Sequence, residues 1–282
     1  MTRHVDVEIG DYRVRVLVDG NTGLVVVLCS GLGGRALHWT DTVEDLKTDH
    51  TVVRFDRPGT PRTRVLHWHP TVRGEADRIA AVLEAITGPR QSGEKAVVVG
   101  HSVGGFYAEG FARLHPDRTH ALLLLDSSIA TSKARLPLRP KLAAVGVATR
   151  LLDASHLRTP LARAALSLVQ RRRPGGLDSP MRSQLSIAAT EPGIARAVLA
   201  EYVAYPQLGA ELRALRTTNP LPPVRCVVAT AHTGWRSLGW RGRQIRLAEA
   251  LGAEHVTIAP AGHLVMVEQP QRTAGIIRAL AR

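Results

Sequence analysis

The chain has 282 residues, of which 44% are hydrophobic, and it carries a formal net charge of +13 with only two cysteines. This length fits one large α/β domain or two small ones, and the apolar content is typical of a globular protein. Cys29 and Cys226 lie in apolar strand-like runs, which favours buried thiols over a disulfide scaffold or a zinc site. Neither a membrane-spanning apolar run nor a secretory signal is visible, so a cytoplasmic protein is expected.

Most of the positive charge is concentrated in one segment. Residues 131–190 contain eleven lysines and arginines against two acidic residues, a net charge of +9. Such a segment could face an anionic surface or an anionic substrate, although a solvated arginine-rich surface is the plainer interpretation. Because aromatic residues are scarce there, binding of nucleic acid through base stacking is not expected.

The first part of the chain predicts an antiparallel edge followed by parallel strands. The first two strand-like runs alternate apolar and polar residues as in a hairpin, whereas the later runs are continuously apolar, as in buried parallel strands. The expected strands are Val5–Ile9, Tyr12–Val18, Leu24–Cys29 and Thr51–Phe55, and the expected helices are Thr40–Lys47 and Thr71–Ile86. Ser30-Gly31-Leu32-Gly33-Gly34 follows the third strand, and its glycines allow backbone N–H groups to point inward.

Residues 97–107 read Val-Val-Val-Gly-His-Ser-Val-Gly-Gly-Phe-Tyr. The valines end a buried strand, and apolar residues at helical spacing follow as far as Leu114. Between them lies a G-x-S-x-G pattern centred on Ser102, which in a strand–turn–helix context predicts a nucleophile elbow. A serine at the tip of such a turn has strained backbone angles, and the flanking glycines let the chains pass. Ser102 is therefore the candidate nucleophile, exposed at the positive N-terminus of a helix.

After the strand Ala121–Asp126, the alternation of strands and helices stops. Residues 127–220 instead predict helices punctuated by prolines and glycines. The helices expected in this segment are Lys141–Leu152, Thr159–Gln170, Gln184–Ala189 and Ile194–Tyr205. The elements expected after it are the strands Val224–Ala229 and His255–Ile258, the helix Ile245–Leu251, and a last helix from Met266 or Glu268 to Leu280.

This order of elements resembles the α/β-hydrolase fold family over nearly the whole chain. The resemblance rests on the glycine-rich loop, the turn Asp56-Arg57-Pro58-Gly59, the elbow, and a late Ala261-Gly262-His263. It implies a doubly wound, mostly parallel eight-stranded sheet with a helical cap inserted between two strands. Residues 1–126 and 221–282 would form the α/β-hydrolase core, and residues 127–220 the cap or lid.

His263 is the candidate general base for Ser102. It follows the strand His255–Ile258 in a loop with Gly262, at the edge where parallel sheets bind their ligands. His101 lies inside the elbow and is expected to face away from Ser102 and to pack. His67 and His69 stand two residues apart without a carboxylate partner, so no metal site is predicted.

The third member of a triad is where this sequence departs from the family's commonest pattern. In the family the acid usually follows the strand after the cap, but residues 230–248 contain neither Asp nor Glu. Some members take the acid from the end of the preceding strand, and Asp126 stands there. The resemblance therefore implies that Asp126 accepts a hydrogen bond from His263 Nδ1. An Asp at this strand end also occurs in members that use another acid, so a structural role stays open.

An oxyanion hole requires two hydrogen-bond donors. The resemblance implies the backbone N–H groups of Val103, next to the nucleophile, and of Leu32, in the glycine-rich loop. Gly31 and Trp39 are candidate residues of the substrate pocket, which Trp235 and Trp240 could also line, although core packing is the plainer interpretation for each tryptophan.

The leading hypothesis is a cofactor-free serine hydrolase of the carboxylesterase class (EC 3.1.1), acting on a small-molecule ester through an acyl-enzyme. A thioesterase or an amide- or aminopeptidase-type hydrolase follows it. A dehalogenase or an epoxide hydrolase is disfavoured because both need a carboxylate where Ser102 stands. The rival from another class is a non-catalytic relative that binds a small ligand or a partner protein, which the missing acid after Val224–Ala229 favours.

Overall fold

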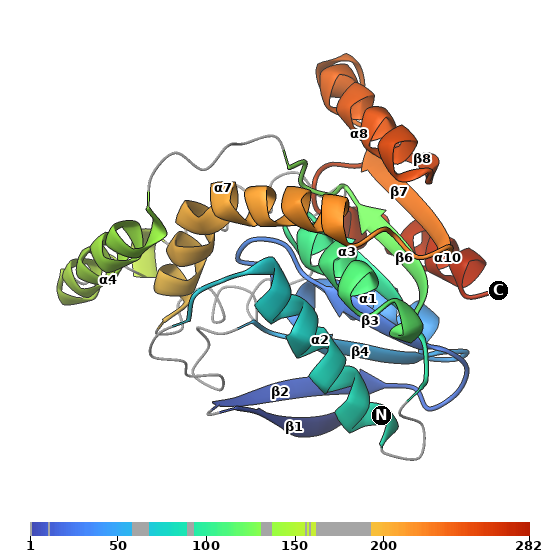
Figure 1. The fold of residues 1–282 in the computed structure, drawn as a ribbon, viewed down its shortest axis with the longest axis horizontal. Coiled ribbons are helices and arrows are strands. Elements are labelled where there is room, and N and C mark those ends of the chain that lie inside the picture. The colour runs from blue at the N-terminus through green and yellow to red at the C-terminus, as the bar shows by residue number, and fades with distance from the viewer. Residues whose placement is uncertain are drawn as a thin grey trace.

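The computed structural model describes residues 2–10, 12–57, 68–88, 93–130, 137–155, 157, 159–161 and 193–282. Within these residues, eight strands form one sheet in the order β1-β2-β4-β3-β5-β6-β7-β8 (Figure 1). The strands are β1 (Arg3–Ile9), β2 (Tyr12–Asp19), β3 (Val25–Cys29), β4 (Thr51–Phe55), β5 (Ala96–His101), β6 (Thr119–Leu125), β7 (Arg225–Ala231) and β8 (Glu254–Ile258). Pairing is antiparallel for β1 with β2 and β2 with β4, and parallel from β4 to β8, which confirms the predicted sheet.

Helices cover both faces of the sheet because successive strand residues point to opposite faces. On β3, Val27 and Cys29 pack on one face, whereas Val26 and Leu28 pack on the other. The first face is covered by α2 (Val72–Thr87), α3 (Gly104–Leu114) and α8 (Leu238–Leu251). The second is covered by α1 (Thr40–Leu46), α9 (Val265–Glu268) and α10 (Pro270–Leu280). Short 3₁₀ turns form η1 (Ala36–Trp39), η3 (Pro116–Arg118) and η4 (Trp235–Ser237).

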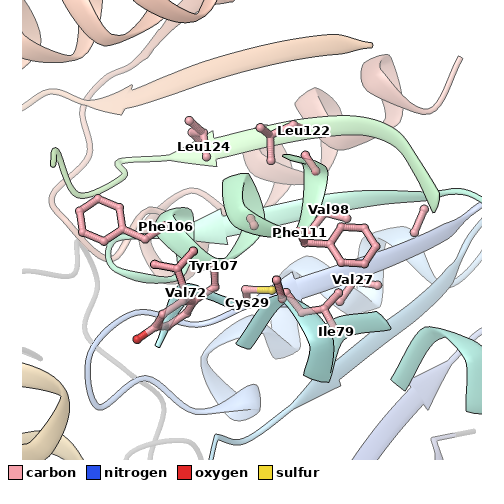
Figure 2. Packing of buried hydrophobic residues seen from close by; sticks show 14 of the residues in the cluster. Val27, Cys29, Val72, Ile79, Val98, Phe106, Tyr107, Phe111, Leu122 and Leu124 are labelled. Carbon is pink, nitrogen blue, oxygen red and sulfur yellow. The ribbon is translucent and has the colours of Figure 1, made fainter. Parts of the chain in front are cut away.

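The core beneath α2 and α3 is densely apolar. Figure 2 shows the Cys29 side chain among the aliphatic and aromatic side chains that the sheet and these helices contribute. Burial raises the pKa of both thiols, Cys29 and Cys226, to about 12. They are free and buried, as predicted, and remain protonated near neutral pH, which makes them poor nucleophiles.

Two long helices lie between β6 and β7 in the chain, namely α4 (Leu138–Ala154) and α7 (Ile194–Thr218). The expected end of the second helix at Tyr205 is wrong, because α7 continues through Pro206. A proline removes one backbone donor, but the later turns of α7 bury Leu208, Leu212 and Leu215 in the core, which favours continuing the helix. Figure 1 shows α7 lying across α3.

Several predictions on this segment fall outside the described residues. They are the helix Gln184–Ala189, all but the start of the helix Thr159–Gln170, and most of the basic residues between 131 and 190. That residues 127–220 form a cap distinct from the core stays a prediction. The expected last helix is two helices, since α9 ends at Glu268 and Pro270 begins α10.

None of the helices in the described part of the chain combines the length and the apolar character needed to cross a membrane.

Candidate active site

Ser102 occupies the turn between β5 and α3, and its backbone φ angle is +54°. This left-handed conformation is uncommon for a residue with a side chain, and it is typical of functional sites. The flanking glycines make the turn possible. A Cβ on Gly100 would lie 2.4 Å from the carbonyl O of Gly104, and one on Gly105 would lie 2.0 Å from Ser127 Oγ. The local geometry is that of the predicted elbow.

The strand register sets Asp126 beside Ser102. β5 and β6 pair in parallel with His101 opposite Leu125, so the residues that follow them leave the sheet together. The backbone N–H of Ser102 donates to the carbonyl of Leu125 at 3.2 Å. Asp126 has a φ angle of +43°, and it and Ser102 are the two non-glycine residues with positive φ among those described. Both strand ends are therefore strained at the same point of the sheet edge.

His263 joins these two side chains. Its Nδ1 atom lies 2.6 Å from Asp126 Oδ2, and its Nε2 atom lies 3.1 Å from Ser102 Oγ. The Asp126 side chain is only 3% exposed, whereas the His263 side chain is 51% exposed and accessible to a substrate. With its proton on Nδ1, the imidazole donates to Asp126 and accepts from the Ser102 hydroxyl. The structure thus places the three predicted residues in one hydrogen-bonded chain.

The glycine-rich loop after β3 passes directly over the nucleophile. A Cβ on Gly31 would lie 2.8 Å from Ser102 Cβ and 2.9 Å from His101 Nδ1. The start of α3 also lies close to the end of β3, since a Cβ on Gly104 would lie 2.6 Å from the carbonyl oxygens of Cys29 and Ser30. Leu32 and Val103, the predicted oxyanion donors, flank this contact from the loop and from the turn before α3.

Comparison with known protein families identifies the family of the chain. The model of the alpha/beta hydrolase family matches residues 26–276. The chain belongs to this family. The match runs from β3 to α10 and therefore includes Ser102, Asp126 and His263.

Known alpha/beta hydrolases resemble the chain to different extents. "Putative carbamate hydrolase RutD" of Caulobacter sp. (strain K31) is 34% identical over 102 residues, which is 36% of this chain and 36% of that protein. The epoxide hydrolase CorEH superposes with a TM-score of 0.75 at 19% identity, covering 99% of this chain and 98% of that one. The enol-lactonase of Burkholderia xenovorans LB400 has a TM-score of 0.67 at 18% identity, covering 98% and 99%. At these identities, the two structures show the fold alone.

Trp240, a pocket candidate from the sequence, contacts the candidate acid of the site instead. Its indole N–H donates to Asp126 Oδ1 at 2.7 Å, and the backbone N–H of Ala231 donates to the same oxygen at 3.1 Å. Together with His263, these donors provide hydrogen-bond partners for both oxygens of the buried carboxylate. In the sequence, Trp240 stands in α8 with no local signal of this contact.

Trp240→Phe is expected to lower kcat about 10- to 100-fold, because a hydrogen bond to a charged group contributes roughly 1.5–3 kcal/mol. The indole packing surface is largely replaced by the phenyl ring, and the Ala231 donor stays in place. Steady-state hydrolysis of an activated ester measures the effect. Trp235→Phe, at a side chain that is mostly exposed, is the matched control and should remain within twofold of wild type. Equal rates for both variants would remove Trp240 from the site.

His101 is buried, and it also contacts the backbone of the candidate base. Its Nε2 atom lies 2.6 Å from the carbonyl O of His263, and the two rings are 4.7 Å apart. Burial, together with the nearby His263, holds the pKa of His101 well below its usual range. The neutral ring with its proton on Nε2 therefore donates to the backbone of His263. Nδ1 has no hydrogen-bond partner among the described residues.

The depressed pKa of His101 predicts a pH dependence of stability. In the unfolded chain, His101 takes up a proton as the pH falls through about 6.5, whereas in the folded chain it stays neutral. Stability is therefore present above pH 6.5 and lost below it, by up to roughly 1.4 kcal/mol per pH unit. His101→Gln removes this contribution, so the free energy of unfolding in urea should fall less steeply between pH 6.5 and 5.5. Identical slopes for variant and wild type would contradict the assignment.

The other predicted pocket residues divide into two groups. Gly31 lies against Ser102, as described, whereas Trp39 is fully buried and its indole N–H donates to Ser30 Oγ at 3.0 Å. Trp39 therefore lies in the core and not at an open surface. A small pocket of about 30 Å³ adjoins the glycine-rich loop. It is lined mainly by that loop, by the residues after β4, and by Ile194, Ala197, Val198 and Glu201 of α7.

Among the described residues, no group of three or more His, Cys, Asp and Glu side chains is arranged to hold a metal ion. His67, one of the pair weighed in the sequence analysis, lies outside the described residues.

Proposed function

We propose that the chain is a serine hydrolase that cleaves a carboxylic ester of a small molecule through an acyl-enzyme. The observation that supports this most is the chain of hydrogen bonds from Ser102 through His263 to Asp126. The proposed chemistry uses these side chains, two backbone donors and water, and membership of the alpha/beta hydrolase family is consistent with it.

The proposed reaction has two halves. His263 Nε2 takes the Ser102 proton while Oγ attacks the ester carbonyl, and the oxygen that becomes negative is bound by the N–H groups of Leu32 and Val103. The imidazolium then gives its proton to the departing alcohol, which leaves Ser102 acylated. Water attacks the acyl-enzyme with the same base, and the carboxylic acid leaves. Asp126 stabilises the imidazolium in both halves.

The position of Asp126 weakens the case for a non-catalytic relative. That alternative was supported by the lack of an acid after β7. Asp126, which follows β6, lies within hydrogen-bond distance of His263 and supplies a carboxylate in its stead. An epoxide hydrolase is disfavoured by chemistry, because its first step requires a carboxylate nucleophile and Ser102 is a hydroxyl. The fold shared with CorEH does not change this.

A panel of acyl donors tests the proposal. Purified protein is assayed with p-nitrophenyl acetate, butyrate and octanoate, the matching thioesters and p-nitroanilides, and styrene oxide. Esters are expected to turn over fastest, with a preference among acyl lengths. Faster hydrolysis of the thioesters or anilides would shift the proposal to the thioesterase or amidase alternative. Turnover of the epoxide without any ester hydrolysis would contradict it.

A further inference from the structure

The loop that carries Leu32 is held at both ends by two consecutive residues that follow β4. Asp56 accepts the backbone N–H of Ala36 and the Arg35 Nε–H, each at 2.7 Å, and so holds the far end. Arg57 donates to the carbonyl oxygens of Ser30 and Gly31, the second at 2.7 Å, and so holds the near end. The dipeptide therefore fixes the loop on either side of the proposed oxyanion donor.

The hydrogen bond from Arg57 to the Gly31 carbonyl fixes the direction of the Leu32 N–H. The carbonyl of Gly31 and the N–H of Leu32 belong to one planar trans peptide, so they point in opposite directions. Arg57 and the N–H of Gly34, at 3.0 Å, both bind the Gly31 oxygen. Rotating the peptide plane would break both bonds. The Leu32 N–H is thereby held facing away from Arg57.

Arg57 is in turn held by α7. Its guanidinium lies 2.9 Å from Glu201 Oε2 and 5.2 Å from the centre of the Tyr107 ring, and the Tyr107 hydroxyl donates to Glu201 Oε1 at 2.6 Å. The Arg57 side chain is 10% exposed and that of Glu201 is 3% exposed. Val198, one turn before Glu201, lies against the same loop, since a Cβ on Gly33 would be 3.1 Å from its Cγ2.

We propose that Arg57 is a positioning residue for the oxyanion hole, and that Glu201 couples the placement of α7 to the direction of the Leu32 N–H. This inference rests on the proposed function, because it assigns Leu32 the role of an oxyanion donor. The proposed determinant of transition-state binding lies outside the triad.

The chain contains a matched control for this arrangement. Arg78 is paired at 2.8 Å with buried Glu75 and lies 5.1 Å from the centre of the Tyr12 ring, so it repeats the Arg–Glu–Tyr chemistry of Arg57. Its hydrogen bonds go to the side chains of Glu75 and Tyr12 and not to the loop after β3. Replacing either arginine by lysine removes the fork geometry that binds two acceptors at once.

The experiment compares Arg57→Lys, Glu201→Gln and Arg78→Lys with wild type. Each is assayed with p-nitrophenyl acetate and with a trifluoromethyl ketone, which forms a tetrahedral oxyanion on a nucleophilic serine. Arg57→Lys is expected to lower kcat about 10- to 100-fold and to raise the inhibition constant of the ketone in parallel, with KM within threefold, because an oxyanion donor contributes roughly 10²–10³ in kcat. Glu201→Gln should lower kcat about three- to tenfold, with a parallel rise in the inhibition constant of the ketone, because Arg57 keeps its bonds to the loop but loses a charged partner. Arg78→Lys should keep kcat within twofold.

The comparison requires an active wild-type protein and variants whose fold is confirmed by circular dichroism. Under these conditions, equal kcat and equal ketone inhibition for Arg57→Lys and Arg78→Lys would overturn the proposal. If Arg57→Lys does not fold, the test uses Glu201→Gln and Tyr107→Phe, which remove contacts of the same cluster. Wild-type kcat and wild-type ketone inhibition for both variants would overturn the proposal. A wild-type protein that neither hydrolyses esters nor reacts with a fluorophosphonate would instead refute the proposed function, and this inference with it.

Discussion

Asp126→Asn is expected to lower kcat about 10⁴-fold while the protein remains folded, as for the equivalent change in a serine protease triad. The reason is the tautomer of His263. An asparagine turns its carbonyl oxygen to the donors of Ala231 and Trp240, which leaves its amide group facing His263 Nδ1. The imidazole then accepts at Nδ1 and carries its proton on Nε2, where it cannot take the proton of Ser102.

Asp19→Asn provides the control for this change. Asp19 is also a buried carboxylate, paired with Arg54 at 3.2 Å, but it lies at the end of β2. Its variant should lose stability while keeping kcat within threefold. If Asp126→Asn turned over p-nitrophenyl acetate within tenfold of wild type, Asp126 would not be the acid of the triad.

Ser102→Ala is expected to lower kcat about 10⁶-fold, the cost of removing a triad nucleophile in a related case. The substitution deletes one hydroxyl and leaves the backbone of the elbow with a residue of similar conformational preference, so the melting temperature should change by only a few degrees. Residual hydrolysis would come from the oxyanion donors and from substrate binding. Hydrolysis of p-nitrophenyl butyrate by the purified variant measures the loss.

The nearby Ser128 allows a matched comparison. It is buried and its backbone N–H donates to the carbonyl of Ser102 at 2.9 Å, a bond that Ser128→Ala retains. This variant should keep at least a third of the wild-type rate. A Ser102→Ala protein with wild-type turnover would place the reaction elsewhere in the molecule.

The sheet and the elbow were predictable because their signals are local. Continuous runs of valine and leucine occur only where both faces of a strand are buried, and the two cores on either side of β3 show this burial. The glycines around Ser102 form a short sequence pattern, and the structure shows why a side chain would not fit there: Gly100 lies against the Gly104 carbonyl, and Gly104 lies against the carbonyls of Cys29 and Ser30. Asp126 could be named because some members of the resembling family take their acid from the end of this strand, and residues 230–248 contain no acid.

The partners of these residues were not predictable, because they depend on tertiary contacts between distant parts of the chain. Glu201 lies 144 residues from Arg57 in sequence, and Trp240 lies 114 residues from Asp126. A glutamate on a helix and a tryptophan on a helix have ordinary solvent-facing or packing roles in most proteins. Likewise, Pro206 is read locally as the end of a helix, and only the burial of the residues after it explains why α7 continues.

The central claim, that Ser102 is a nucleophile activated by His263 and Asp126, is tested most directly by fluorophosphonate labelling followed by intact-mass and peptide analysis. The wild-type protein is expected to gain one adduct, located on Ser102. Ser128→Ala should label at the same rate, Asp126→Asn far more slowly, and Ser102→Ala not at all. A folded wild-type protein that gains no adduct, or that gains it on a residue other than Ser102, would contradict the claim.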